Sequence, residues 1–126
     1  MPELPEIQAH AERLDAQFAG TVLEKFVTFK FTALKTATPP PDAAYGQPLG
    51  HVGRRGKYLI LGFDEVSFVI HLMQGGRLLV DDKLSPKPRN GQARFMFRDS
   101  PALLLTEAGT ERRAGVWCVA NDQLDG

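Results

Sequence analysis

From residue 21 onward the sequence is a succession of short apolar segments separated by turn residues, which restricts the fold more than any other feature. Turn residues such as Asp64-Glu65, Gly75-Gly76, Arg89-Asn90-Gly91 and Asp99-Ser100-Pro101 separate several of the segments. Short strands with regular turns are typical of a β-sandwich or barrel-like sheet. The segments, rich in Val, Ile, Leu and Phe, lie near residues 21–31, 50–54, 57–63, 67–73, 77–81, 93–98, 102–106 and 115–120.

The first twenty residues have a different period. Apolar residues at positions 7, 11, 14 and 18 form one stripe at helical spacing, Pro5 suits a first helical turn, and Gly20 is a suitable stop. Residues 36–46 form a proline-rich loop. We therefore expect a mainly β fold: a two-layer β-sandwich of seven to eight strands with an amino-terminal α-helix and room for one further short helix.

Size and composition are those of one ordinary globular domain. The 126 residues are 43% hydrophobic and 24% charged. No apolar stretch reaches the ~18 residues that mark a membrane span, and the start does not resemble a secretory signal. The single cysteine, Cys118, excludes an internal disulfide and lies in an apolar run, so we expect a buried thiol. We expect a cytoplasmic protein without a membrane partner, and the sequence leaves its oligomeric state open.

The net charge is zero, but the charge is unevenly distributed. Residues 51–113 hold eleven Lys and Arg against seven Asp and Glu, which gives this part a formal charge of +4. A basic face of this kind is able to follow a phosphate backbone, while scattered solvated charges are an equally good interpretation. Its members include Arg54, Arg55, Lys57, Lys83, Lys87, Arg89, Arg94 and Arg98.

The amino terminus carries a candidate nucleophile. If Met1 is removed, Pro2 offers a secondary amine, and an α-amino group titrates near ~7.7–8.0 against ~10.4 for lysine, so more of it is neutral at pH 7. Attack on a sugar aldehyde carbon gives an iminium that acidifies the neighbouring carbon and permits elimination of phosphate. Glu3 and Glu6 are three residues apart, a spacing that in a first helical turn places both carboxylates near the amine. A plain helix start explains the same pattern.

Four segments, taken in order, carry a resemblance to a known family. They are MPELPE at the start, GRRGKYLI at residues 53–60, VIHLMQGGRL at residues 69–78 and, more weakly, AGTERRAGVW at residues 108–117. Together the segments resemble the amino-terminal catalytic domain of the formamidopyrimidine-DNA glycosylase and endonuclease VIII family. The resemblance implies a β-sandwich flanked by helices, and a DNA glycosylase and abasic-site lyase that removes oxidised bases in base-excision repair.

The resemblance also assigns roles to individual residues. Pro2 matches the nucleophile, Glu3 the carboxylate that protonates the sugar or assists its opening, and Glu6 the second carboxylate beside the amine. Lys57 matches a hairpin lysine that contacts phosphate next to the lesion, and His71 matches a strand histidine that contacts the backbone. The expected partner is damaged or abasic DNA, without a metal or a small-molecule cofactor in this chain.

The sequence departs from the family where a wedge fills the gap left by a flipped nucleotide. The family usually has a Met after an HLG motif, and Gln74 holds that position, with Met73 beside it. The family's Arg and Phe positions fall near Thr106 and Ala108, which are too small to act as a wedge; Arg112 and Arg113 are the larger candidates nearby. We expect the flipping machinery to differ.

A second departure concerns length. We expect residues 1–126 to be the amino-terminal catalytic domain alone, lacking the helix–two-turn–helix and zinc-finger domain. Such a domain should act on exposed abasic sites and act weakly on damaged duplex DNA.

Two other functions fit parts of the sequence. A tautomerase also uses an amino-terminal proline, but as a general base, and its chain runs from that proline into an apolar strand, unlike ELPEIQAH. A catalytically inactive DNA-binding or scaffolding β-domain of the same fold is the stronger alternative, favoured by the missing wedge. A retained Met1 would make the nitrogen of Pro2 an amide and abolish nucleophilic attack.

Overall fold

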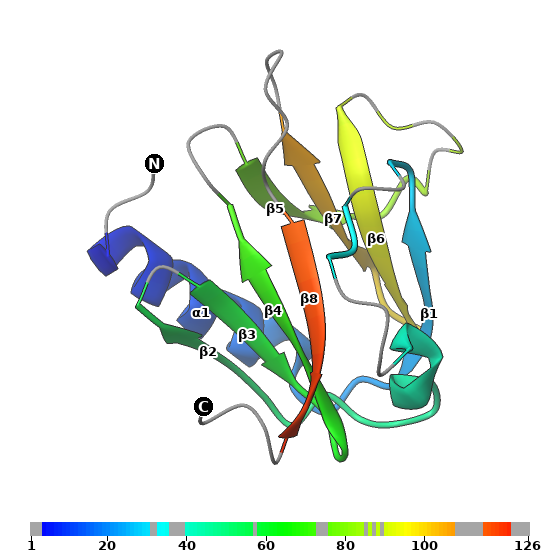
Figure 1. Cartoon of the computed structure of the whole chain (residues 1–126), viewed down its shortest axis with the longest axis horizontal. Helices are drawn as coiled ribbons and strands as arrows, with labels where there is room; N and C mark the ends of the chain where they lie inside the picture. The colour runs from blue at the N-terminus through cyan, green and yellow to red at the C-terminus, as the bar shows by residue number, and fades with distance from the viewer. Residues whose placement is uncertain are drawn as a thin grey trace.

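The computed structural model describes residues 4–30, 33–35, 40–56, 58–72, 76–84, 86, 88, 90–107 and 115–121, with only the backbone of residues 4–6. Two four-stranded antiparallel sheets face each other (Figure 1), with strand orders β1-β6-β7-β5 and β2-β3-β4-β8. The predicted two-layer β-sandwich is confirmed. Its elements are α1 (Leu4–Phe18), β1 (Leu23–Thr28), the 3-10 helix η1 (Pro41–Ala44), β2 (His51–Arg55), β3 (Tyr58–Gly62), β4 (Val66–His71), β5 (Gly76–Asp81), β6 (Gly91–Phe97), β7 (Ala102–Glu107) and β8 (Gly115–Ala120).

The strands lie where the apolar periodicity predicts them, with small differences at their ends. Gly76 and Gly91, expected in turns, are the first residues of β5 and β6. The proline-rich loop contains the short helix η1, for which the sequence left room. Gly20 follows α1 with a φ of +91°, the left-handed conformation that a helix stop favours in glycine.

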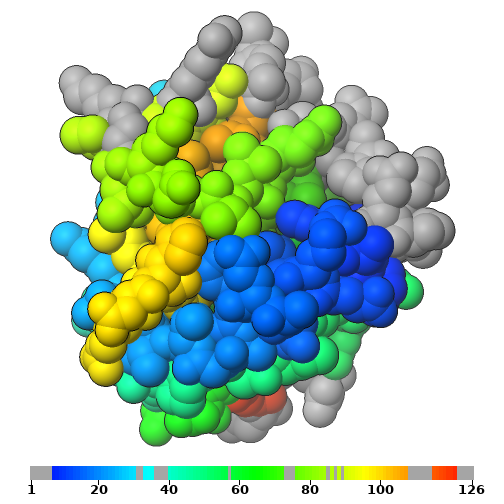
Figure 2. Space-filling view, turned by 180° about the vertical axis from the view of Figure 1, so that it is seen from behind, coloured from blue at the N-terminus to red at the C-terminus, as the bar shows by residue number. Residues whose placement is uncertain are grey.

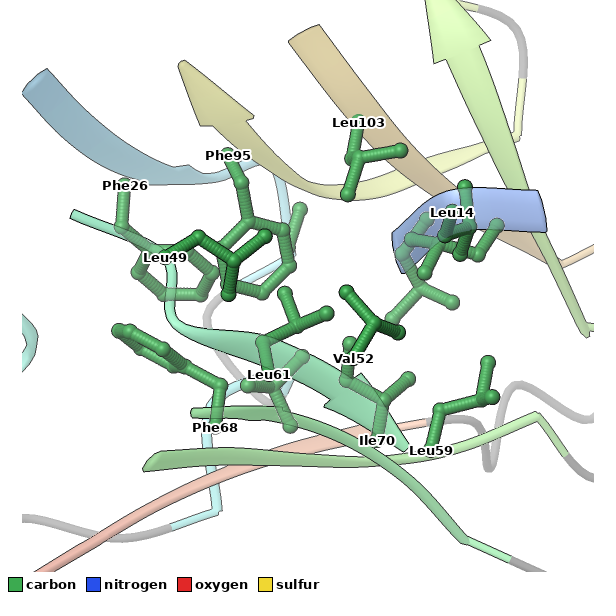
Figure 3. Packing of buried hydrophobic residues seen from close by; sticks show 14 of the residues in the cluster. Leu14, Phe26, Leu49, Val52, Leu59, Leu61, Phe68, Ile70, Phe95 and Leu103 are labelled. Atoms are coloured by element: carbon green, nitrogen blue, oxygen red, sulfur yellow. The ribbon is translucent and has the colours of Figure 1, made fainter. Parts of the chain in front are cut away.

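The hydrophobic core lies between the two sheets, as Figure 3 shows. Phe26 and Phe95 come from one sheet and Phe68 from the other, and the ring centroid of Phe68 lies 5.4 Å from that of Phe26 and 5.0 Å from that of Phe95. Aromatic pairs at such distances add to the stability that their burial supplies. These three rings therefore join the two layers within the core.

Helix α1 lies along the side of the sandwich where edge strands β2 and β5 come from different sheets. Its predicted stripe is buried, with Ile7, Ala11, Leu14 and Phe18 each at most 3% exposed. Nε2 of His10 lies 3.1 Å from the carbonyl oxygen of Leu78 in β5. Figure 2, seen from behind, shows the blue helix beside the green atoms of β5. The helix thus contacts both sheets.

The helix is fixed to β2 by a polar contact as well as by its apolar stripe. Oδ1 of Asp15 accepts a hydrogen bond from the backbone N–H of Val52 at 2.8 Å and lies 3.1 Å from Nδ1 of His51. An edge strand leaves backbone donors without sheet partners, so this carboxylate supplies an acceptor where none would otherwise be available. The orientation of α1 on β2 follows from these contacts.

Candidate functional site

A tight hairpin joins β2 and β3 within the motif that contains the predicted phosphate-contacting lysine. Arg55 pairs with Tyr58, so two sequence positions, 56 and 57, separate the paired residues. Gly56 has a φ of +58°, and two-residue hairpin turns require such a value at their first central position. The sequence GRRGKY therefore makes a hairpin because glycine stands where the left-handed conformation is needed. Lys57 itself lies outside the described residues.

The first turn of α1 contains the backbone of one predicted site residue. Glu6 belongs to that turn by its backbone, whereas Pro2 and Glu3 lie outside the described residues. The amino-terminal end of a helix carries a partial positive charge, which disfavours protonation of an amine placed there. Helix α1 would have this effect on an amine close to its first turn, and the role of Pro2 as nucleophile stays a prediction.

Arg54 connects this part of α1 to the hairpin. Its Nε donates to Oε1 of Gln8 at 3.0 Å, and its Nη1 donates to the carbonyl oxygen of Gly56 at 3.2 Å. One guanidinium thus joins the second turn of the helix to the residue that precedes Lys57. Sequence reasoning included Arg54 only in a basic segment, because no local pattern relates it to a residue 46 positions earlier.

His71 ends β4 and lies one strand away from the hairpin. It pairs with Tyr58 in the sheet register, and the centroids of the two rings are 4.7 Å apart. The structure therefore brings His71, the hairpin between β2 and β3 and, through Arg54, the beginning of α1 to the same end of the molecule. We call this the hairpin end; it comprises residues 4–8, 54–56, 58, 71–72 and 115.

The predicted wedge positions are only partly described. Thr106 lies within β7, where it pairs with Arg77 of β5 and Gly91 of β6. The two neighbouring strands therefore hold Thr106 within the sheet, and its size as a poor wedge stays a prediction. Gln74, Met73, Ala108, Arg112 and Arg113 lie outside the described residues.

A groove of about 600 Å³ runs between α1 and sheet β2-β3-β4-β8. One wall carries Glu12 and Asp15 from the helix, and the other carries Arg54 and Arg55 from β2. His71 does not line this groove. Opposite charges on the two walls make the groove unsuited to a uniformly anionic strand, and its polar residues instead hold α1 against the sheet.

Two arginines of the predicted basic face are paired with acidic residues in the structure. Arg94 is 5% exposed; its Nε lies 3.0 Å from Oδ2 of Asp81, and its guanidinium carbon lies 5.0 Å from the centre of the Phe29 ring. Arg98 forms an exposed ion pair with Glu24 at 3.7 Å. Arg94 and Arg98 each pair with an acidic residue of the chain, whereas Arg54 and Arg55 are exposed at the hairpin end.

Among the described residues, no group of three His, Cys, Asp or Glu side chains is arranged to hold a metal ion. No described helix is long and apolar enough to cross a membrane. Cys118 is buried, as predicted, and burial raises the pKa of its thiol to about 11. The thiol is therefore protonated at neutral pH.

Comparison with known proteins assigns the family. Residues 1–117 match the model of the formamidopyrimidine-DNA glycosylase N-terminal domain. The chain belongs to the formamidopyrimidine-DNA glycosylase family. It is similar to the formamidopyrimidine-DNA glycosylases of Heliobacterium modesticaldum, 33% identical over 85% of this chain and 41% of that protein, and of Desulforamulus reducens, 35% identical over 85% and 40%.

Solved structures of the family share the fold. The Lactococcus lactis formamidopyrimidine-DNA glycosylase bound to DNA containing an abasic site superposes with a TM-score of 0.86 at 19% identity, over 98% of this chain and 47% of that one. The complex of the same enzyme with DNA containing Fapy-dG gives a TM-score of 0.85. The chain thus spans less than half the length of the family members it matches.

Proposed function

We propose that residues 1–126 form the amino-terminal catalytic domain of a DNA glycosylase and abasic-site lyase of the formamidopyrimidine-DNA glycosylase family, acting on oxidised bases and abasic sites. The observation that carries the proposal is the hairpin end, where Arg54 ties α1 at Gln8 to the hairpin at Gly56. The residues of the proposed site come from three segments distant in sequence, and described residues of all three segments lie at the hairpin end, which supports the proposal. The proposal includes a cytoplasmic location, which rests on the ordinary globular composition and the single cysteine.

In the proposed reaction, the neutral nitrogen of Pro2 forms a bond to the deoxyribose carbon that holds the base as the bond from that carbon to the base breaks, and the amine proton leaves with the base; at an abasic site the hydroxyl group on that carbon leaves as water instead. The sugar ring opens as its oxygen takes a proton, for which Glu3 is the proposed donor. The product is an iminium, a cation that withdraws electrons from the neighbouring carbon. That carbon loses a proton, a carbon–carbon double bond forms, and the phosphate on the 3′ side leaves with the electron pair of its C–O bond. Each step balances without a metal or an organic cofactor.

The remaining proposed residues hold the substrate and the charge. Glu6 in the first turn of α1 stabilises the cationic intermediate, because a carboxylate near a developing positive charge lowers its energy. Lys57 and His71 contact the phosphates on either side of the sugar. Gln74 contacts the DNA at the position where the family usually has its wedge residue.

Trapping of the covalent intermediate tests the proposal. The chain, with removal of Met1 verified by mass spectrometry, is incubated with single-stranded DNA containing one abasic site and a hydride donor that reduces the iminium. We expect an adduct whose mass equals protein plus DNA. A variant with one residue added before Pro2 keeps the fold but has no free ring nitrogen, so it should give no adduct. An equal yield from that variant would refute the assignment of Pro2.

A matched pair of acidic residues tests the Glu6 carboxylate. Glu6→Gln should lower the rate of adduct formation about 100-fold, the order of magnitude lost when one electrostatic contact to a charged intermediate is removed. Glu24→Gln removes the same charge from β1, where Glu24 is exposed, and should leave the rate unchanged. Binding without any adduct, with Pro2 free, would favour the inactive DNA-binding domain instead.

A further inference from the structure

A row of side chains crosses sheet β2-β3-β4-β8 at the hairpin end, on the face turned away from the core. Arg55 pairs with Tyr58, Tyr58 with His71, and His71 with Gly115. Three inter-strand steps of roughly 4.8 Å give the row a length of about 14 Å. Tyr58 and His71 occupy its centre, and a cation occupies one end.

The other end of the row also carries a cation. Gly115 has no side chain, and the stem of Lys35 lies over it, because a Cβ atom added there would collide with Cε of Lys35. The backbone holds Lys35 in this place, since its N–H donates to the carbonyl oxygen of Val116 at 2.8 Å. The row therefore consists, in order, of the cation of Arg55, the aromatic ring of Tyr58, the imidazole of His71 and the cation of Lys35.

The ring of Tyr58 is both exposed and fixed. The tyrosine is 40% exposed. Its ring centroid lies 4.7 Å from that of His71 and 6.1 Å from that of Trp117, which meets it edge-on at 82°. Neighbours on one side restrict the ring while solvent reaches the rest, so an incoming flat ligand would find a surface that is already oriented.

Charge on this sheet favours an anion. Strands β2, β3, β4 and β8 contain no Asp or Glu, and their permanently charged residues are Arg54 and Arg55, both exposed. Glu12 and Asp15 face β2 from α1, whereas Tyr58 lies on β3, which pairs with the opposite edge of β2. An exposed aromatic ring flanked by cations, without carboxylates in these strands, suits a ligand that combines flat rings with phosphates. An acidic peptide would satisfy the cations but would leave the aromatic surface without a stacking partner.

We propose that the row formed by Arg55, Tyr58, His71 and Lys35 is a platform for single-stranded DNA, on which an unpaired base stacks against Tyr58 while Arg55 and Lys35 contact the adjacent phosphates. This rests on the proposed function only in taking DNA as the ligand. Duplex DNA hides the faces of its bases, so the platform engages abasic sites in single-stranded or gapped DNA. The platform lets the domain bind DNA without inserting a wedge residue into a duplex.

The only tryptophan of the chain reports on the platform, because Trp117 contacts Tyr58. Undamaged oligothymidylate is titrated into the whole chain while the fluorescence of Trp117 is followed. The comparison ligand is an oligonucleotide of equal length built from abasic sugar analogues, which has the same phosphates but no bases. We expect the oligothymidylate to quench the fluorescence and to bind at least five-fold more tightly, since base stacking on an aromatic residue adds to phosphate contacts. Equal affinity for the two ligands would overturn the proposal.

Variants at the two tyrosines locate the contact. Tyr58→Leu should weaken binding of oligothymidylate at least five-fold, and Tyr58→Phe, which keeps the ring, should bind as the native chain does. Tyr45→Leu is the matched control, because Tyr45 is the other tyrosine, is 37% exposed and lies beside η1. If one variant fails to fold, the affinities of the unaltered chain for oligothymidylate and for the base-free oligonucleotide still test the platform. Equal weakening by Tyr58→Leu and Tyr45→Leu would overturn the proposal.

Adduct formation separates this inference from the proposed function. If the chain forms no adduct but still prefers oligothymidylate to the base-free oligonucleotide, the lyase proposal fails and the platform proposal stands. A normal adduct with an oligothymidylate affinity no higher than that of the base-free oligonucleotide would remove the platform and leave the lyase.

Discussion

Nε of Arg54 lies 3.0 Å from Oε1 of Gln8, and this contact joins a strand to a helix that begins fifty residues earlier in the chain. The same guanidinium also bonds the carbonyl oxygen of Gly56. Since Gly56 precedes the proposed phosphate-contacting Lys57, the position of the hairpin relative to α1 depends on Arg54. We therefore expect Arg54 to act as a positioning residue for the proposed reaction.

Replacement of Arg54 should therefore affect the reaction more than the fold. Arg54→Met keeps the apolar stem but removes both hydrogen bonds, and exposed polar contacts of this kind contribute about 0.2–1 kcal/mol to stability. We expect a change of less than about 1 kcal/mol in the free energy of unfolding, together with at least a five-fold lower rate of adduct formation. Arg98→Met, an exposed arginine paired with Glu24, should not change the rate. Similar rates for the two variants would contradict the positioning role.

Binding to DNA should depend on salt through Lys57. The slope of log affinity against log salt concentration becomes shallower by about one unit for each lysine that no longer neutralises a phosphate. Lys57→Ala should show this decrease in fluorescence titrations at several salt concentrations. Lys25→Ala, an exposed lysine of β1 in the other sheet, provides the comparison and should leave the slope unchanged.

The ion pair between Arg94 and Asp81 should be costly to break. The Arg94 and Asp81 side chains are 7% and 11% exposed, and removal of one partner leaves a buried charge uncompensated. Asp81→Asn should lower the free energy of unfolding by about 3 kcal/mol, measured by urea denaturation. Asp82→Asn at the exposed neighbouring position should change it by less than about 0.5 kcal/mol. Equal effects would show that the pair contributes only as a surface contact.

His10 should make the fold less stable in mild acid. Burial lowers its pKa below 6.5, assisted by Arg13, although the bond to the Leu78 carbonyl acts in the opposite direction. The unfolded chain therefore binds a proton at pH values where the folded chain does not, so stability falls as the pH drops below about 6.5. His10→Gln should reduce the loss of stability between pH 7 and pH 5. Parallel stability curves for the two proteins would refute the role of His10.

Cys118 should react slowly in the folded chain. Burial raises its pKa from 9.0 to about 11, so at pH 8 the thiolate population is about 100-fold smaller than in an unfolded chain. A colourimetric disulfide reagent should label it at least 100-fold more slowly without urea than with it. Cys118→Ala, which has no thiol, gives the background signal of the reagent. Labelling at the same rate in both conditions would show that the thiol is accessible.

The sequence predicts the elements well and their contacts poorly. Short apolar segments between turns locate the eight strands in the described part of the chain, and the stripe from Ile7 to Phe18 locates α1, because each element must bury one face. Periodicity assigns Arg94 to the face turned away from the core, but it does not reveal that Asp81 and Phe29 cover that face. The contact of Arg54 with Gln8 is hidden for the same reason.

For the predicted site, too, the sequence identifies individual residues better than it identifies their contacts. Motif resemblance predicts Pro2, Glu3, Glu6, Lys57, His71 and Gln74 individually, and the structure places His71 next to the hairpin by strand pairing. Tyr58 and Lys35 escape attention in the sequence, since an exposed tyrosine and lysine are ordinary surface residues until strand register aligns them with His71 and Gly115. Pairing between distant strands, rather than local composition, creates the row.

The absence of carboxylates from strands β2, β3, β4 and β8 has a consequence for how the protein meets a polyanion. Fifteen acidic residues balance fifteen basic ones in the whole chain, yet these four strands hold two arginines and no acid, so they carry a formal charge of +2. A local excess of positive charge attracts a polyanion to that part of a surface even where the total charge is zero. A pI of 6.8 therefore does not exclude binding of a polyanion, because the charge near the contact matters more than the sum over the chain.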